Sequence, residues 1–144
     1  MDKNSSKEEV IKVLRRDGNL IRFANPDFKK DFDVVMTAVK NNGTSLYYAD
    51  KTLKDNDDIV INAVKKNGLA LKYASERLKN IEHIVELAVK NNGDSLEYAS
   101  ELLRGNENIV KLAVNEYGQA IRYANDSLRK NKEIITIAVK NRGS

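Results

Sequence analysis

Six of the seven glycines in this chain are spaced 25 residues apart. They stand at positions 18, 43, 68, 93, 118 and 143, and only Gly105 lies outside the series. The neighbouring residues repeat in the same register, as in AVKNNGTSLYYADKTLK from Ala38 and AVKKNGLALKYASERLK from Ala63. A short fixed period of this kind is the sequence signature of a repeat protein. The 144 residues therefore predict about five and a half repeats of 25 residues, and not one ordinary compact domain.

Each repeat is predicted to begin with a long amphipathic helix. Apolar residues such as Ile59, Val60, Ala63 and Val64 recur at i, i+1, i+4 and i+5, which is the spacing of one helical stripe. Residues that can cap free amide groups precede the stripe in four repeats, at Asp31, Asn56, Asn106 and Asn131. The helix is expected to end at the periodic Gly, in the left-handed conformation that favours Gly at helix C-termini.

A short second helix is predicted after each periodic Gly. It carries an aromatic column that we expect to be core or half-buried, with stacking of bases or of a peptide as the alternative role: Phe23, Tyr48, Tyr73, Tyr98 and Tyr123. An Ala and then a capping residue follow each ring, and Pro26 in the first repeat disfavours helical geometry just before it. A separate turn, helical or 3₁₀, is expected to return one more apolar side chain to the core.

A unit this small cannot bury its apolar face alone, because about 1 to 2 kcal/mol of backbone entropy opposes the ordering of each residue. Neighbouring repeats must therefore stack, which is the logic of a solenoid. The predicted fold is all-α: a right-handed α-solenoid whose unit is a long helix, a short helix and a helical or 3₁₀ turn. We expect residues 1–8 to be a flexible polar N-terminus and residues 9–143 to be a single repeat domain.

The joint pattern of Ala-Val-Lys, Asn-Gly and Tyr-Ala, seen in AVKNNGDSLEYASELLR from Ala88, resembles a known tandem-repeat family. That family is a domain of unknown function, number forty-one sixteen, and occurs as arrays in bacteria, protists and large viruses. The resemblance implies a helical repeat architecture and a scaffolding or recognition role, with no catalytic residue or cofactor to carry over. The chain departs from the pattern in the first repeat at Val13, Leu14 and Phe23, and in the fifth repeat at Asn115, Glu116 and Tyr117.

The composition argues against most enzyme chemistry. The chain has no Cys and one His, which excludes thiol nucleophiles and makes histidine-based metal clusters improbable. The acidic segment KDNDD from Lys54 to Asp58 lacks the residue order of a calcium loop. His83 occupies a helix-start column with Asp and Glu and is expected to be exposed. We therefore expect a non-enzymatic protein without a metal or cofactor.

The sequence also predicts a location away from membranes. It has no apolar run of about 18 residues, as a spanning helix requires. The segment from Met1 to Glu9 is polar and lacks the pattern of a signal peptide. We expect a cytoplasmic protein.

One column of the long helix predicts a protein-binding patch. Ile11, Met36 and Ile61 are replaced in later repeats by Glu86, Lys111 and Thr136. These positions lie four residues before a basic column and so share the polar side of the helix, where an apolar patch marks a binding site. The alternative is simple coverage of the core. The off-column aromatics Tyr47 and Tyr117 are further candidates for partner contact.

Two basic columns suggest an alternative function, which is binding of single-stranded nucleic acid. The candidate phosphate-binding ladder is complete in five repeats: Lys29, Lys54, Lys79, Arg104 and Arg129. The other column, which Asn115 interrupts, is Arg15, Lys40, Lys65, Lys90 and Lys140. Both columns stand where a helix is expected to end, and cations there also complement the helix dipole. The net charge of +4 does not decide between these roles.

The last long helix predicts a third possibility, self-assembly. Its apolar residues have no following short helix to cover them: Ile134, Ile135, Ile137, Ala138 and Val139. Terminal repeats normally carry polar caps, so this helix is expected either to form a homodimer or to continue into a longer array. The leading functional prediction remains a scaffold that binds a protein partner, with nucleic-acid binding and self-assembly as alternatives.

Overall fold

The structure is a computed structural model that describes residues 5–141, and all regular elements within that range are helical. Long α-helices open the repeats: α1 (Lys7–Arg16), α2 (Phe32–Asn41), α4 (Asp57–Lys66), α5 (Glu82–Asn91), α7 (Glu107–Glu116) and α9 (Lys132–Lys140). Second helices of 3₁₀ type follow: η1 (Gly18–Phe23), η3 (Gly43–Tyr48), η4 (Gly68–Tyr73), η6 (Gly93–Tyr98) and η7 (Gly118–Tyr123). Short turns complete the units: η2 (Phe28–Lys30), α3 (Lys51–Lys54), η5 (Leu78–Asn80), α6 (Glu101–Arg104) and α8 (Asp126–Arg129). The predicted all-α repeat solenoid is confirmed, and its right-handed sense stays a prediction.

The predicted start of the repeat domain shifts by two residues. Helix α1 begins at Lys7 and not at Glu9, because the Ser6 side chain accepts a hydrogen bond from the Glu9 backbone N–H at 3.2 Å and so caps the helix there. Lys7 and Glu8 therefore belong to the folded array. Residues 1–4 of the predicted flexible N-terminus and the predicted domain end at residue 143 lie outside the described residues.

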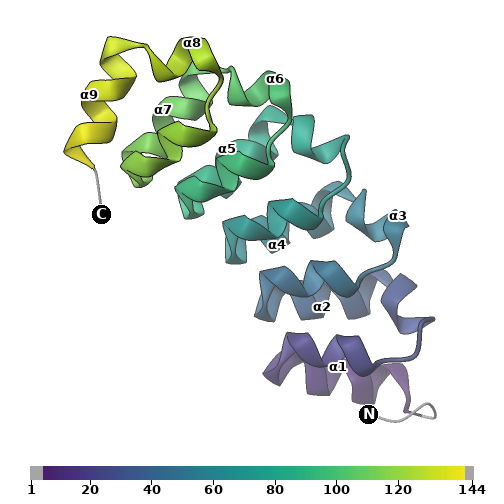
Figure 1. The fold of residues 1–144 in the computed structure, drawn as a ribbon. Helices are drawn as coiled ribbons and strands as arrows, with labels where there is room; N and C mark the ends of the chain where they lie inside the picture. The colour runs from purple at the N-terminus through teal and green to yellow at the C-terminus, as the bar shows by residue number, and fades with distance from the viewer. Residues whose placement is uncertain (1–4, 142–144) are drawn as a thin grey trace.

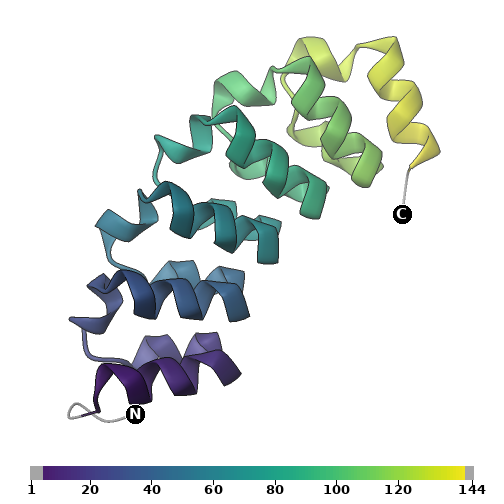
Figure 2. The ribbon, with the colours of Figure 1, turned by 180° about the vertical axis from the view of Figure 1, so that it is seen from behind.

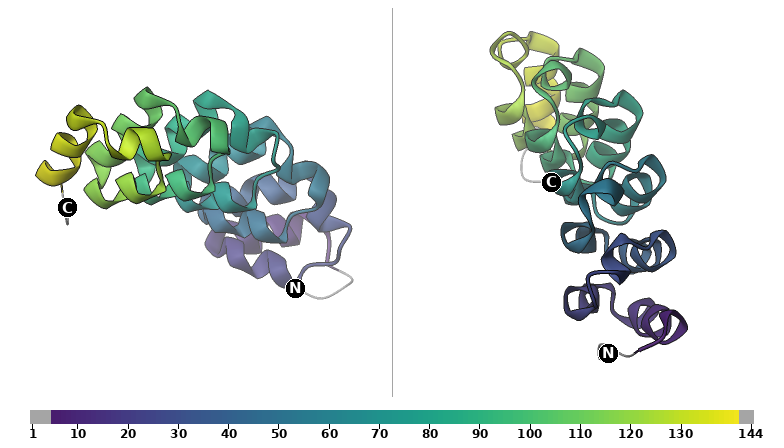
Figure 3. Two further views of the ribbon diagram at one scale, coloured as in Figure 1. Left: turned by 45° about the horizontal axis from the view of Figure 1, so that its top comes forward. Right: turned by 90° about the vertical axis from the view of Figure 1, so that its right-hand side faces the viewer.

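The units stack into an arc of two layers (Figure 1). Successive long helices contact one another in the order α1, α2, α4, α5, α7 and α9, and the 3₁₀ helices η1, η3, η4, η6 and η7 form a parallel second row. The rear view and the side views show the same two rows following one curve (Figures 2 and 3). The short helices α3, α6 and α8 lie on the outer edge of the arc, and the long helices end at its inner edge (Figure 1).

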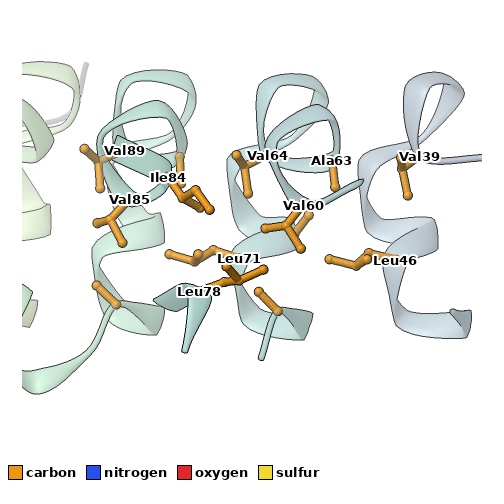
Figure 4. Packing of buried hydrophobic residues seen from close by; sticks show 14 of the residues in the cluster. Val39, Leu46, Val60, Ala63, Val64, Leu71, Leu78, Ile84, Val85 and Val89 are labelled. Carbon is orange, nitrogen blue, oxygen red and sulfur yellow. The ribbon is translucent and has the colours of Figure 1, made fainter. Parts of the chain in front are cut away.

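The predicted apolar stripe forms the core between the layers. In α4, Ile59, Val60, Ala63 and Val64 are all 0% exposed. Figure 4 shows Val60, Ala63 and Val64 of this stripe beside Ile84, Val85 and Val89 of α5, with Leu71 of η4 and Leu78 of η5 below them. Each unit thus supplies one face of the core, and its neighbour supplies the other. Burial of each large apolar side chain contributes about 1.5 to 3 kcal/mol.

Capping residues hold the units at defined positions. The predicted caps of the long helices are confirmed, since each accepts a hydrogen bond from a backbone N–H at 3.0 to 3.1 Å: Asp31, Asn56, Asn106 and Asn131. At the outer edge, the backbone N–H of Asp50 donates to the carbonyl of Lys29 at 2.8 Å, one repeat earlier. The same bond recurs at three later junctions, from Ser75 to Lys54, from Ser100 to Lys79 and from Asn125 to Arg104.

The periodic glycines have a different cause from the one predicted. The residue before each Gly, such as Asn67 with φ −151° and ψ 110°, ends the long helix in an extended conformation, and the Gly begins the 3₁₀ helix. No left-handed backbone is found at Gly18, Gly43, Gly68 or Gly93. A Cβ at any of these four positions would lie under 3.0 Å from the carbonyl oxygen of an Ala in the next long helix. Gly is required because two backbones approach closely there.

Alternate repeats carry an amide clamp at the inner edge. The Asn91 side chain accepts a hydrogen bond from the Gly68 N–H at 2.6 Å and donates one to the Lys65 carbonyl at 3.2 Å. Asn41 makes the equivalent pair of bonds to the first repeat, at 2.6 and 3.1 Å. Lys66 and Glu116 occupy this position in the intervening repeats. Two consecutive units of 25 residues, one with the clamp and one without it, therefore form a larger repeat of twice that length.

Candidate protein-binding groove

A groove of about 650 Å³ lies on the outward face of the long-helix layer, over α1, α2 and the end of α4. Ile11 of α1 and Met36 of α2 supply its apolar surface. Both side chains are half-buried and pack against the core from one side. They occupy the same position in successive helices, so the stacking of the first two units is what brings them together. The predicted apolar patch is thus realised in part by an open groove.

Three cations from three successive helices border this groove: Arg15, Lys40 and Lys66. All three are exposed, and none takes part in an ion pair within residues 5–141. Arg15 and Lys40 belong to a predicted basic column, whereas Lys66 replaces the clamping Asn of the neighbouring repeats. A groove with an aliphatic surface and a cationic border suits an acidic, partly apolar ligand.

The remaining polar groups of the groove are already engaged. The Asp33 carboxylate accepts a hydrogen bond from the Lys7 ammonium at 2.9 Å, and Asp31 lies 3.1 Å from the same nitrogen. The hydrogen bond to Asp33, followed by that to Asp31, raises the pKa of Lys7. Asn41 holds the backbone of the first repeat, and the Thr37 hydroxyl donates to the Asp33 carbonyl at 2.8 Å. The one carboxylate of the groove therefore already has a cationic partner.

The other candidates for partner contact lie apart from this groove. Ile61 of α4 continues the column and is half-buried, but it is not part of the groove lining. Tyr47 lies in the second layer and is 54% exposed, with its ring edge-on to Tyr48 and Tyr73. Tyr117 is the C-cap residue that follows α7 and is half-buried at the inner edge. The structure therefore brings together two of the five predicted patch residues.

The aromatic column lies in the second layer, as predicted. Tyr48, Tyr73, Tyr98 and Tyr123 are half-buried, while Phe23 in the first repeat is 62% exposed, since no earlier unit among the described residues covers it. Cations lie over some of these rings, with Arg22 4.5 Å from the centre of Phe23. No ring of this column lines the groove.

The candidate phosphate-binding ladder lies on the outer edge, where its members have other roles. Lys29, Lys54, Lys79 and Arg104 are half-buried, and their carbonyls accept the bonds that join consecutive repeats. The Lys54 ammonium lies 5.5 Å from the centre of the Tyr47 ring, and Lys79 pairs with Glu76 at 3.3 Å. Arg129 is exposed and pairs with Asp126. This geometry favours the structural interpretation of the column.

Neither a metal centre nor a membrane segment is found in the part of the chain that the structure describes. No group of three or more His, Cys, Asp or Glu side chains within residues 5–141 is arranged to hold a metal ion. Among the described helices, none combines the length and the apolar character needed to span a bilayer.

These features define the class of the protein: a helical repeat protein of the α-solenoid type with an open, basic-bordered groove. The chain belongs to the family described as Domain of unknown function (DUF4116), whose model matches residues 6–54, 56–104 and 106–144. Each of the first two matched segments spans two structural repeats, in agreement with the alternation of the Asn clamp. Neither a curated protein nor a solved structure matches the chain.

Proposed function

We propose that this protein is a non-enzymatic helical repeat scaffold that binds a protein partner through the groove formed by α1, α2 and α4. The observation that carries the proposal is the half-buried pair of Ile11 and Met36, which stays open to solvent between exposed cations. In the later repeats the same column holds Glu86 and Lys111. If the column only covered the core, its residues would be expected to stay apolar along the whole array.

The charged members of the column support this interpretation. The Lys111 ammonium lies 3.1 Å from a carboxylate oxygen of Glu107 and 3.1 Å from one of Glu133. The hydrogen bond to Glu133, and then that to Glu107, raises the pKa of Lys111. The column position is thus compatible with solvated charge in this fold. An apolar residue at this position is therefore better explained by recognition of a partner than by a contribution to folding stability.

The test is affinity purification with the intact chain as bait, followed by identification of the bound protein. We expect a partner that is lost when Met36→Glu replaces the wild-type bait. The Met36→Glu variant should keep its helical circular dichroism and its melting temperature within a few degrees, because the side chain is half-buried and its counterpart in α5 is already Glu86.

Two further variants make the test specific. Thr136→Glu changes the equivalent position of α9 and should leave the partner bound, while Ile61→Glu should weaken binding less than Met36→Glu because Ile61 lies outside the groove lining. A partner that binds Met36→Glu as well as wild type, or a collapse of the melting temperature in that variant, would contradict the proposal.

A further inference from the structure

The inner edge of the arc carries a row of free cations over its first four long helices. Six side chains in the last turns of α1, α2, α4 and α5 are exposed: Arg15, Arg16, Lys40, Lys65, Lys66 and Lys90. None of the six forms an ion pair or lies over an aromatic ring within residues 5–141. The row is interrupted in the fifth long helix, α7, by Asn115 and Glu116, and Lys140 occupies the same column in α9.

The acidic residues that balance the net charge lie mainly elsewhere. The long helices carry acids in their first turns, at the outer edge, where cations also gather. There Arg77 pairs with Asp55 at 2.9 Å and with Asp57 at 3.0 Å, and hydrogen bonds to Asp57 and then Asp55 raise the pKa of Arg77. The net charge of +4 therefore hides a separation of charge across the width of the array.

Helix dipoles alone do not account for the inner row. The C-terminus of a helix carries the equivalent of about half a negative charge, and one nearby cation more than balances it. Helices α1 and α4 end with two cations each, Arg15 with Arg16 and Lys65 with Lys66. The excess positive charge is left to solvent, or to a ligand that brings negative charge.

The basic row and the apolar column coincide in the same half of the molecule. Ile11, Met36 and Ile61 occupy α1, α2 and α4, and three of the six cations border the groove that Ile11 and Met36 line. The apolar column ends in α5, where Glu86 stands, and the basic column is interrupted one long helix later, at Asn115 of α7. The two columns overlap in α1, α2 and α4, where one ligand can contact both the apolar residues and the cations.

We propose that the occupant of this surface is an acidic segment of a protein partner, with aliphatic side chains that enter the groove and carboxylates that lie along the basic row. The inference rests on the proposed protein-binding function and adds the chemistry of the partner. A single-stranded nucleic acid is the other polyanion to consider, but its binding relies on aromatic rings that stack with bases. The groove lining contains no aromatic ring, and the Tyr column lies in the other layer.

Fluorescence anisotropy with defined probes tests the assignment on the intact chain. The probes are a labelled peptide of Glu and Leu, an all-Glu peptide of the same charge, and labelled oligo(dT). We expect the Glu and Leu peptide to bind more tightly than either of the others, and its affinity to fall as salt rises because the contacts are exposed. The double variant Lys40→Glu with Lys66→Glu should weaken that binding by about tenfold or more, as repulsion replaces attraction.

A matched control separates local charge from net charge. Lys51 and Lys130 are exposed residues of the outer edge, and their double change to Glu lowers the net charge from +4 to zero, as the Lys40 and Lys66 pair does. The control should bind the Glu and Leu peptide within about twofold of wild type. Equal losses in both double variants would overturn the inner-edge assignment.

The outcomes distinguish the partner chemistry from the proposed function itself. Tighter binding of oligo(dT) than of the peptide would reassign the surface to nucleic acid. No peptide binding, combined with an identified partner that still depends on Met36, would overturn the acidic partner and leave the protein-binding groove intact. An identified partner that is insensitive to Met36→Glu would instead remove the proposed function.

Discussion

Helices α7 and α9 carry nearly the same apolar stripe in opposite environments. Val110 and Val114 of α7 are 0% exposed, because α9 and η7 follow and cover them. Their equivalents in α9, Ile135 and Val139, are 39% and 66% exposed. The stripe itself does not determine burial in this fold. Each unit contributes half of an interface, and the next unit in the array supplies the other half.

The opposite end of the array shows how such a face can be closed by sequence. Glu9 of α1 is exposed, and it stands in the column where Val34, Ile59 and Ile84 are at most 1% exposed. The first unit therefore has a charged residue in place of a core residue on the side that no other described unit covers. The same repeated pattern therefore occurs in three environments: buried inside the array, exposed with a charged residue in α1, and exposed with apolar residues in α9. A substitution can change which of these environments a position suits.

The largest effect is expected at the interior glycines. In Gly68→Ala the new Cβ would collide with the carbonyl of Ala88 and with the Ser95 hydroxyl. Alanine suits a backbone with negative φ, so the collision alone should cost about 3 kcal/mol in the free energy of unfolding, measured by urea denaturation. Gly105→Ala is the control, because its Cβ meets mainly the side-chain amide of Asn125, which can move. Equal losses in both variants would contradict the close-approach explanation.

A matched pair of valines tests the covered and uncovered states directly. Val64→Ala in α4 removes two methyl groups from a fully buried site and should lower the free energy of unfolding by about 2 kcal/mol. At protein concentrations too low for two copies to associate, the same change at Val139 in α9 should lower it by less than about 0.5 kcal/mol, because that side chain is 66% exposed in the single chain. Chemical denaturation of both variants measures the difference. A loss at Val139 as large as that at Val64 would show that another chain covers α9 in solution.

The amide clamp is predicted to contribute less than the apolar core. Asn91→Ala removes the acceptor of the Gly68 N–H and the donor to the Lys65 carbonyl. These two hydrogen bonds join neighbouring repeats at the inner edge, where one is partly buried and the other is exposed to solvent. We expect a loss of about 1 to 1.5 kcal/mol in the free energy of unfolding. Glu116→Ala at the same column in a repeat without the clamp should change it by less than about 0.5 kcal/mol. If the two variants are equally stable, the alternation has no energetic role.

Sequence reasoning recovered the features that depend on one unit and its period. The 25-residue register, the stripe of Ile59 and Val60, and the caps at Asp31 and Asn56 were all predictable, because helical periodicity and capping are local. The role of the glycines was not, since the backbone that a Cβ would strike belongs to the next repeat. The alternation of Asn41 and Asn91 was visible in the sequence, but the shorter period concealed it.

The candidate site was only partly predictable for the same reason. The column of Ile11 and Met36 follows from helical spacing, so two members of the groove could be found. Which basic column is free could not be found, because Lys29 and Arg15 both stand at helix ends in the sequence. Stacking decides between them: it half-buries every member of the Lys29 column except Arg129 at the outer edge and leaves the Arg15 column exposed at the inner edge. Lys66 belongs to neither basic column, so only the stacked structure shows that it lies beside the groove.

The smallest effect on folding, and the clearest on assembly, is expected at the two ends. Within the described residues α9 has no covering helix, so we expect two copies to associate through Ile135 and Val139, with Ile121 and Ala138 in the same apolar hollow. A copy docked by its first unit would bury Glu9 against this surface, which disfavours head-to-tail growth and favours a closed symmetric pair. Light scattering should then report a dimer that Ile135→Glu with Val139→Glu converts to a monomer with unchanged helical circular dichroism. Glu9→Ile removes the charge that opposes head-to-tail contact and should yield larger species. A wild-type chain that stays monomeric at every concentration would show that an exposed stripe of this size is too small to hold two copies together.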